Sequence, residues 1–211
     1  MQVVILAGGS GTRLREETEF KPKPMIKIGP YPIIVHIMKH YAHYGFNDFI
    51  IAAGYRQEMI KEYFSHFPMY NNDIYCYRAP EGMWSSDFVG ERGWVDFEVL
   101  VSDTGENTLK GGRLKKIQHY IKGDTFMLTY GDSVANVNIP DLLDFHYRHG
   151  KMVTITGVHP APRFGEVFHS NGQVQAFVEK KDNDCYVNGG FMVMSRGIFD
   201  CLNDEDRKSV V

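Results

Sequence analysis

The sequence predicts an α/β fold with a mixed, mostly parallel sheet flanked by helices. Short apolar runs typical of buried strands alternate with segments of helical periodicity, the pattern of a sheet with crossover helices. Further along, two β-rich segments flank Asn171-Gly172, a hairpin signal that predicts antiparallel strands after the parallel series. The 211 residues suit one domain, residues 1–211, long enough to bury a substantial core.

The expected strands of the main sheet are short runs, most of them continuously apolar. The first runs directly into glycines and is apolar throughout, as expected of a central strand that is buried on both faces. In chain order, the expected strands are Val3–Ala7, Phe49–Ala53, Trp94–Val101, Phe126–Tyr130 and Met152–Val158.

Helices are expected where apolar residues recur at helical spacing and a start or stop signal lies nearby. Gly45 lies just beyond the first such segment, Pro68 is expected to close the second, and Pro140 is expected to open a later one. The expected helices are Ile33–Tyr44, Gln57–Phe67, Gly112–Ile121, Pro140–His149 and Arg196–Leu202.

Two segments stand apart from the alternating series. The predicted hairpin consists of Glu166–Ser170 and Gln173–Val178, and we interpret it as an inserted substrate-binding region. Ala79–Gly93 has the weakest pattern in the chain and is predicted to be a loop. Trp84 and the neighbouring Trp94 are interpreted as residues that anchor the ends of this loop.

Composition narrows the class of partner. The formal net charge is only −3, which argues against a general electrostatic grip on nucleic acid, so a bound polyanion is expected to be small. No apolar run approaches the ~20 residues of a membrane span, and the chain starts without the basic leader of a signal peptide. Cys76, Cys185 and Cys201 are widely spaced and suggest no disulfide framework, so a reducing cytoplasmic setting is expected.

A glycine-rich loop follows the first predicted strand. In Gly8-Gly9-Ser10-Gly11-Thr12-Arg13, the glycines allow backbone amides to approach phosphate oxygens with no Cβ in the way. Arg13 offers a bidentate guanidinium for the same anion. The loop matches neither the Walker A sequence nor the dinucleotide fingerprint, and a turn that merely reverses the chain is the less favoured alternative. We therefore predict a cradle for a nucleotide triphosphate.

Two lysines lie a short distance beyond this loop. In Lys21-Pro22-Lys23-Pro24-Met25 the alternating prolines hold the backbone extended and present both lysine side chains at fixed positions. Lysines in a loop are usually just solvated. Because these two lie close in sequence to the predicted anion cradle, we predict that at least one of them binds phosphate.

These residues carry a resemblance to a known family. Gly8–Leu14 together with Lys23-Pro24-Met25 resembles the signature of the sugar-1-phosphate nucleotidyltransferases. Later segments are similar to the glucose-1-phosphate cytidylyltransferases within that family, and the five matched segments follow in order along nearly the whole chain. The later segments are Asp103-Thr104-Gly105 with Gly111-Gly112-Arg113-Leu114, then Tyr130-Gly131-Asp132, then Arg163-Phe164-Gly165 with Asn188-Gly189-Gly190-Phe191.

The resemblance implies a Rossmann-like fold of the nucleotide-diphospho-sugar transferase type and a group-transfer reaction. A sugar-1-phosphate oxygen would attack the α-phosphorus of a nucleoside triphosphate, and pyrophosphate would leave. Arg13, Lys23 and Asp132 are the implied catalytic residues, with Lys23 against the α-phosphate. The implied nucleotide-binding residues are Leu6, Ala7, Gly8, Gly9, Ser10, Gly11, Thr12, Arg13, Lys23, Thr104, Gly105, Gly111 and Arg113.

Asp132 is also the predicted metal ligand. It follows a predicted strand, at the edge where ligands gather in open α/β sheets. A carboxylate there suits Mg²⁺, which binds one or two carboxylates together with substrate phosphates and water. The alternative is a turn aspartate that accepts hydrogen bonds from backbone amides. The position and the resemblance favour the metal role.

The resemblance places the sugar phosphate near the predicted hairpin. The implied contacts are Glu179, Lys180, Asn188 and Gly189. Lys180 would pair with the phosphate of the sugar, while Glu179 and Asn188 would hydrogen-bond its hydroxyls. The chain departs from the family at Lys181, where proline is usual, and at Tyr31, where lysine is usual; Tyr31 is assigned no role.

The choice of nucleotide depends on the resemblance alone. A cytosine pocket needs hydrogen-bond acceptors for the exocyclic amine, which backbone carbonyls can supply. We expect CTP and glucose-1-phosphate to give CDP-glucose and pyrophosphate with Mg²⁺, in nucleotide-sugar biosynthesis for lipopolysaccharide O-antigen. Two alternatives stay open: the same reaction with dTTP or UTP, and a non-catalytic regulator that binds nucleotide sugars. A homo-oligomer is expected by analogy.

The end of the chain bears on the metal site. By the resemblance, relatives continue beyond Val211 into a segment that supplies a second carboxylate, and we find no counterpart to it in the single domain 1–211. With Asp132 as the sole protein carboxylate, Mg²⁺ would be held mainly by phosphates and water. The expectation is a chain that binds CTP better than it turns it over, either a truncation or a short form.

Three histidines at helical spacing invite a zinc interpretation. His36, His40 and His43 fall at i, i+4 and i+7, but no acidic or cysteine ligand accompanies them. They also lie off the apolar stripe of their predicted helix. We therefore predict a solvated helix face rather than a metal site.

Overall fold

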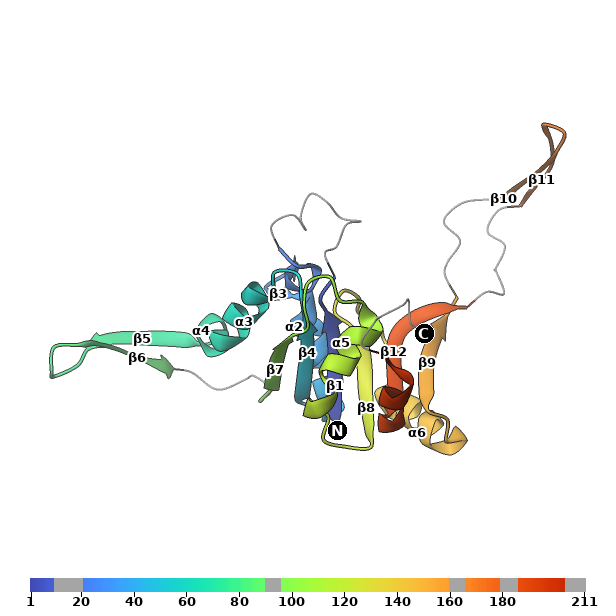
Figure 1. Ribbon diagram of the computed structural model, residues 1–211. Helices are drawn as coiled ribbons and strands as arrows, with labels where there is room; N and C mark the ends of the chain where they lie inside the picture. Colours follow the sequence, from blue (N-terminus) through green and yellow to red (C-terminus); the bar gives the residue numbers. More distant parts are fainter. Residues whose placement is uncertain (10–20, 90–95, 160–165, 179–185, 204–211) are drawn as a thin grey trace.

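The computed structural model describes residues 1–9, 21–89, 96–159, 166–178 and 186–203. Within these residues the centre is a six-stranded sheet with helices on both faces (Figure 1). Across the sheet, the strands are β7 (Glu98–Asp103), β4 (Asp48–Ala53), β1 (Gln2–Ala7), β8 (Thr125–Tyr130), β12 (Val187–Ser195) and β9 (Val153–Val158). The predicted α/β class with a mixed, mostly parallel sheet is confirmed.

β1 is a central strand of this sheet. It pairs in parallel with β4 and with β8, and β4 pairs in parallel with β7. The register aligns Ala7 with Ala53 and Ala53 with Asp103, so the carboxyl ends of these strands meet at one edge. β12 runs antiparallel to both β8 and β9, which makes the sheet mixed. The shared carboxyl edge is where open α/β sheets bind their ligands.

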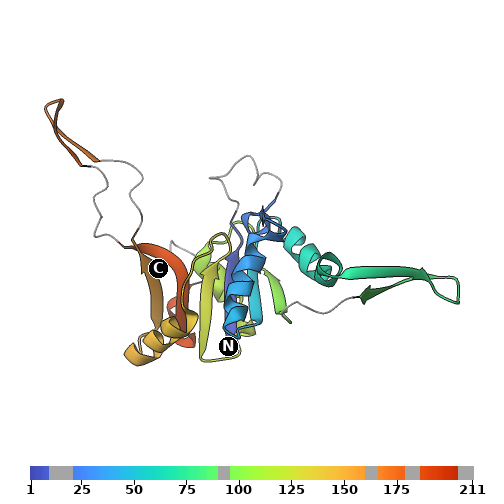
Figure 2. The ribbon, with the colours of Figure 1, turned by 180° about the vertical axis from the view of Figure 1, so that it is seen from behind.

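Successive residues of β1 face two separate cores because side chains alternate along a strand. Val3 and Ile5 are fully buried on one face, and Val4 is fully buried on the other, which explains why the whole strand is apolar. Figure 2 shows α2 lying over the first face. The first core includes residues of α2 (Ile33–His43), α3 (Gln57–Ser65) and α6 (Ile139–His149). The second includes residues of α5 (Lys110–Lys116) and η3 (Arg196–Cys201), together with Ile117 and Ile121 on either side of η2 (Gln118–Tyr120).

Several predicted boundaries were wrong. The helix predicted over Gln57–Phe67 is divided: α3 ends at Ser65, and Pro68 lies in the first turn of a second helix, α4 (Phe67–Asn71). Proline is tolerated there because the first N–H groups of a helix have no intrahelical partner. The strand expected over Trp94–Val101 corresponds to β7, which spans Glu98–Asp103, and Trp94 itself lies outside the described residues. Among the described residues, no helix combines the length and the apolarity that crossing a bilayer requires.

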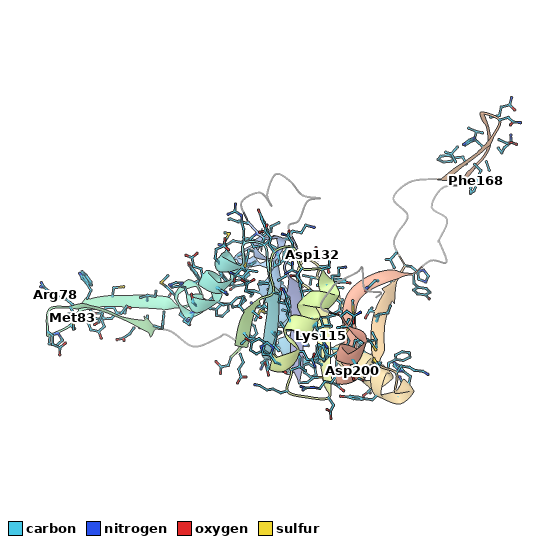
Figure 3. All side chains as sticks on the ribbon, viewed as in Figure 1. Arg78, Met83, Lys115, Asp132, Phe168 and Asp200 are labelled. Carbon is cyan, nitrogen blue, oxygen red and sulfur yellow. The ribbon has the colours of Figure 1, made fainter. Side chains whose placement is uncertain are left out.

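The loop predicted over Ala79–Gly93 contains a strand instead. β6 (Trp84–Val89) pairs antiparallel with β5 (Asp73–Arg78), and this hairpin projects away from the sheet beyond α4 (Figure 1). Figure 3 labels Arg78 and Met83 at its far end. Trp84 is 79% exposed, so the prediction that it anchors a loop was wrong. The hairpin packs on no core face, which removes the alternation that signals a half-buried strand.

The second hairpin has the predicted bounds. β10 (Glu166–Ser170) and β11 (Gln173–Val178) pair on either side of Asn171-Gly172. Both turn residues have positive φ, 51° and 80°, as this two-residue turn requires. The two strands form a separate two-stranded sheet, so the antiparallel member of the main sheet is β12 rather than this hairpin.

Candidate active site

A cleft of about 670 Å³ opens at the carboxyl ends of β1 and β8. One wall is the end of β1 with the glycines that follow it, and another is the end of β8 with its turn. The 3-10 helix η1 (Lys23–Met25) and the segment leading into α5 form the sides. Figure 3 labels Asp132 at this edge of the sheet. The described lining residues are Leu6, Ala7, Gly8, Gly9, Lys23, Pro24, Thr108, Leu109, Lys110, Arg113, Tyr130, Gly131 and Asp132.

Two glycines allow the walls of this cleft to approach one another. The amide of Gly131 donates to the carbonyl of Leu6 at 2.9 Å. A Cβ at Gly131 would lie 3.0 Å from Pro24 Cγ and 3.1 Å from that same carbonyl oxygen. A Cβ at Gly8 would lie 2.0 Å from the guanidinium of Arg113. Side chains at either position would push the walls apart, so both glycines are needed to build the cleft.

Lys23 and Asp132 face one another across the cleft. The Lys23 Nζ lies 3.5 Å from Asp132 Oδ2, and the two side chains are 20% and 45% exposed. The backbone of η1 is anchored because Pro24 and Met25 are buried. An ion pair this accessible contributes only about 0–1 kcal/mol, so a phosphate or a cation can replace either partner. The structure thus brings together two of the three predicted catalytic residues.

Lys21 takes a different place from Lys23. It lines a separate cavity of about 170 Å³, which also includes Lys27 and Tyr63. Of the two lysines predicted to lie near the phosphate cradle, only Lys23 lines the cleft. The turn at η1 sends the two side chains to different surfaces even though a single proline separates them.

Arg113 is buried beneath the cleft and hydrogen-bonds the backbone at the start of the glycine loop. It is 4% exposed, and its Nη2 donates to the carbonyl oxygen of Gly8 at 2.8 Å. Its Nη1 lies 3.1 Å from the carbonyl oxygen of Ala53 and 2.7 Å from Thr104 Oγ1. Gly8, Ala53 and Thr104 stand at the ends of β1, β4 and β7, so one side chain ties three parallel strands together. The nucleotide contact predicted for Arg113 stays a prediction.

Of the other residues predicted around the base and ribose, Thr104 and Gly105 accept hydrogen bonds from Arg113. Thr104 is fully buried and donates its hydroxyl to the carbonyl of Ala53, so it does not line the cleft. The carbonyl of Gly105 accepts from Arg113 Nη1 at 2.7 Å. Gly111 lines a neighbouring apolar cavity of about 50 Å³. None of these three is among the described lining residues of the cleft, and their predicted contacts with nucleotide stay predictions.

On the side predicted to bind sugar, Asn188 reaches the cleft through Tyr130. Its Nδ2 lies 3.3 Å from the Tyr130 hydroxyl, and its Oδ1 accepts from the amide of Gly190 at 2.8 Å. Gly189 is half-buried, and a Cβ there would lie 3.0 Å from Val158 on the neighbouring strand. Both residues stand at the start of β12, next to the end of β8.

Sequence reasoning assigned no role to several residues of the cleft, and Tyr130 and Lys110 are the two whose side chains contact each other. Tyr130 and Lys110 both line it, and the Lys110 Nζ lies 3.3 Å from the Tyr130 hydroxyl and 4.4 Å from the centre of its ring. Tyr130 had a usable signal because it directly precedes Gly131-Asp132 at the end of a predicted strand. Lys110 directly precedes Gly111, and an isolated lysine there carries no signal of its own.

Several predicted site residues lie outside the described part of the chain. In the phosphate loop these are Ser10, Gly11, Thr12 and Arg13, and on the sugar side they are Glu179 and Lys180. Their roles therefore stay predictions.

Two of the three helical histidines contact backbone carbonyl groups. The Nε2 atoms of His36 and His40 each lie 2.9 Å from a backbone carbonyl oxygen, of Ile28 and Val137 respectively. His43 is exposed and the other two are half-buried, so the predicted solvated face holds for His43 and only in part for His36 and His40. Within the described ranges, no three His, Cys, Asp or Glu side chains are grouped so that they could hold a metal.

The profile of the nucleotidyl transferase family matches residues 2–210 of this chain. The chain therefore belongs to that family, and the resemblance to sugar-1-phosphate nucleotidyltransferases is confirmed. It is 43% identical to the glucose-1-phosphate cytidylyltransferase of Salmonella typhi, over 97% of this chain and 79% of that protein. It is 39% identical to a probable glucose-1-phosphate cytidylyltransferase of Bacillus subtilis, over 96% of this chain and 78% of that one.

Solved structures agree on the fold. The chain superimposes on the crystal structure of HddC from Yersinia pseudotuberculosis with a TM-score of 0.66, at 23% identity. The alignment covers 97% of this chain and 81% of that one. A UDP-glucose pyrophosphorylase complexed with UDP-glucose gives a TM-score of 0.62 at 15% identity, over 99% of this chain and 80% of that one. The predicted nucleotide-diphospho-sugar transferase fold is confirmed.

Proposed function

We propose that this protein transfers the cytidylyl group of CTP to glucose-1-phosphate, giving CDP-glucose and pyrophosphate. The observation that carries the proposal is the 43% identity, over 97% of the chain, to proteins named glucose-1-phosphate cytidylyltransferase. The cleft supports it, because an ammonium, a carboxylate and a glycine loop meet at the ligand-binding edge of the sheet.

The proposed reaction needs positioning and charge neutralisation more than it needs an acid or a base. The amides of Gly8 and Gly9, together with Arg13, are proposed to bind the triphosphate. An oxygen of the sugar phosphate forms a bond to the α-phosphorus as the bond to pyrophosphate breaks. Lys23 is proposed to place its ammonium beside the α-phosphate, where negative charge builds up during this exchange.

Mg²⁺ is the proposed cofactor, with Asp132 as its protein ligand. The carboxylate of Asp132 is accessible, and its partner, the ammonium of Lys23, is weakly held. A single carboxylate fits a cation that completes its coordination with phosphate oxygens and water. Such a cation would neutralise phosphate charge as a Lewis acid.

The acceptor is proposed to lie on the side of the cleft nearer β12. Asn188 and Gly189 stand there, and Asn188 is proposed to hydrogen-bond sugar hydroxyls through its amide. Glu179 and Lys180 are proposed to complete this side, with Lys180 against the phosphate of the sugar.

Product analysis tests the proposed function. The protein is mixed with glucose-1-phosphate, Mg²⁺ and CTP, UTP, dTTP or ATP in turn, and nucleotide sugars are identified by mass spectrometry. We expect CDP-glucose from CTP, and none when EDTA removes the metal. Preference for UTP or dTTP would contradict the cytidylyl assignment alone. Nucleotide binding without product from any triphosphate would favour a non-catalytic regulator.

We also propose that the protein is a homo-oligomer of the cytoplasm that supplies nucleotide sugar for lipopolysaccharide O-antigen. The projecting β5–β6 hairpin supports self-association, because Tyr75, Trp84 and Phe88 on it are each more than half exposed. The free thiols of Cys76 and Cys201 fit a reducing compartment.

A further inference from the structure

Lys110 differs from the other cationic side chains that line the cleft. Lys23 pairs with Asp132, and the terminal nitrogens of Arg113 face backbone carbonyls and Thr104. Among the described residues, the polar partner of the Lys110 ammonium is a neutral group, the Tyr130 hydroxyl at 3.3 Å. The ammonium also lies over the Tyr130 ring, 4.4 Å from its centre. Within the described part of the chain, the positive charge of Lys110 therefore has no acidic partner and stays available to an anionic ligand in the cleft.

An arriving phosphate can displace this contact. A solvated ring face attracts an ammonium only weakly, and a neutral hydroxyl is a weaker partner than a phosphate oxygen. The lysine side chain is exposed, and its four-carbon stem rotates readily. Moving the ammonium from Tyr130 to a phosphate therefore replaces weak interactions with a charge-assisted hydrogen bond.

Tyr130 also indicates which substrate Lys110 meets. Its hydroxyl lies 3.3 Å from Asn188 Nδ2 as well as 3.3 Å from the Lys110 Nζ, so both side chains converge on one oxygen. Asn188 belongs to β12, which lies on the side of β8 opposite to β1 and its glycine loop. A ligand that contacts Asn188 thus lies within reach of Lys110.

We propose that Lys110 binds the phosphate of the sugar-1-phosphate and leaves Tyr130 when the acceptor enters. This inference rests on the proposed function, which makes a sugar phosphate the second substrate. Both substrates are anions, so the acceptor oxygen approaches the α-phosphate against like-charge repulsion. An ammonium on the acceptor side reduces that repulsion and holds the attacking phosphate, while Lys23 serves the nucleotide.

Steady-state kinetics of Lys110→Gln test the proposal. The KM for glucose-1-phosphate is expected to rise roughly 10- to 100-fold, the effect of losing one charge-assisted hydrogen bond. The KM for CTP should stay within about twofold, and Lys110→Arg should restore most of the acceptor affinity because it keeps the charge. A rise in the KM for CTP instead, or no change for either substrate, would overturn the proposal.

Lys39→Gln is a matched control. The Lys39 Nζ also lies over a tyrosine ring, 4.2 Å from the centre of Tyr31, but it does not line the cleft. Its substitution removes the same charge from a similar environment and should leave both KM values unchanged. An equal rise in the acceptor KM for Lys39→Gln would show a general effect of net charge and would also overturn the proposal.

Equilibrium binding separates this inference from the proposed function. Glucose-1-phosphate and glucose are titrated by calorimetry into the wild-type protein and Lys110→Gln, with a non-hydrolysable CTP analogue present. The variant should lose affinity for glucose-1-phosphate and show the same weak response to glucose. If the wild type makes no nucleotide sugar yet shows this difference, the proposed function fails and the role of Lys110 stands. If both proteins bind glucose-1-phosphate equally, the role of Lys110 fails.

Discussion

Lys23 and Asp132 act as each other's counter-ion across the 3.5 Å that separates them. Because both side chains are accessible to solvent, their ion pair is weak, and a ligand can separate them at little cost in free energy. A triphosphate that carries a divalent cation presents the opposite charges to both members at once. The ammonium can then turn to a phosphate oxygen while the carboxylate turns to the cation, and neither charge is left without a partner.

Substituting Lys23 tests this division of roles. Lys23→Ala should lower turnover about 10²- to 10³-fold, as the loss of one pre-organised donor at a developing charge does. The KM for CTP should change much less, because the proposed partner is the reacting phosphoryl group. Lys21→Ala is the matched control, since Lys21 lines a separate cavity. Turnover of Lys23→Ala within a few-fold of the wild type, or equal losses in both variants, would remove Lys23 from the chemical step.

The residue pattern around Lys21 and Lys23 indicated that at least one of them binds phosphate, and only the family resemblance chose Lys23. Both flank Pro22, so they lie at nearly the same distance from the glycine loop along the chain. The choice depends on η1, whose turn buries Pro24 and Met25 and directs Lys23 into the cleft. The role of Lys110 could not be predicted from the sequence for a related reason. Its contact with Tyr130 joins residues that are 20 positions apart and lie on different elements.

Among the secondary-structure elements, three parallel strands depend on one side chain. Arg113 donates to backbone at the ends of β1 and β4 and to Thr104 after β7. Arg113→Met should lower the free energy of unfolding by roughly 2–5 kcal/mol, because several buried acceptors lose their donor. Urea denaturation measures this loss. Arg78→Met, in the exposed hairpin, should change it by less than about 0.5 kcal/mol. A similarly small change for Arg113→Met would show that water can replace the guanidinium.

The end of α6 depends on a histidine pair. His146 is 3% exposed, and its Nδ1 lies 2.8 Å from Thr154 Oγ1, to which His149 Nε2 also lies close at 2.7 Å. Burial, and then the neighbouring His149, lower the pKa of His146 below its ordinary value of 6.5. The folded state therefore favours the neutral form of the His146 imidazole. The contacts of both histidines with Thr154 join α6 to β9.

The sign of this shift gives a pH dependence. Above pH 6.5 both the folded and the unfolded chain keep this ring neutral, and the full stability is present. As the pH falls below that value, the unfolded chain takes up the proton first, so stability is lost. Thermal unfolding measured from pH 7.5 to 5 should show this fall, and His146→Gln should flatten it relative to His43→Gln at an exposed position. Identical slopes in the two variants would rule out His146 as the cause.

How far the elements could be predicted depended on what they pack against. β1, β4 and β8 are buried on both faces and are continuously apolar for most of their length. Their apolar runs therefore predicted their bounds to within about one residue. The β5–β6 hairpin could not be found in the same way, because its side chains are largely exposed and carry no alternating pattern. The prediction that Pro68 closes a helix was wrong because proline is also common in the first turn of a helix, and Pro68 lies in the first turn of α4.

On the scale of the whole molecule, the β5–β6 hairpin exposes large apolar side chains that no contact within the described chain explains. A strand pair with an exposed tryptophan and phenylalanine, standing away from the body, is the kind of surface that proteins bury in assemblies (Figure 1). Light scattering should show a mass above that of one 24.2 kDa chain. The double substitution Trp84→Ser, Phe88→Ser should shift this mass towards the monomer. Tyr147→Ser, an exposed aromatic residue of α6, should not. A monomeric wild type would contradict the proposal.

The central position of β1 has a consequence for how the chain is made. Val3 pairs with Phe49 on one side and with Met127 on the other, so the two neighbours of this strand leave the ribosome far apart in time. At about 5–20 residues per second, the β8 side of β1 waits several seconds after β4 has emerged. During that wait an apolar strand edge is open to pairing with another nascent chain. The same long-range closure predicts slow folding after dilution from denaturant, so chaperones that shield strand edges should raise the yield of this protein.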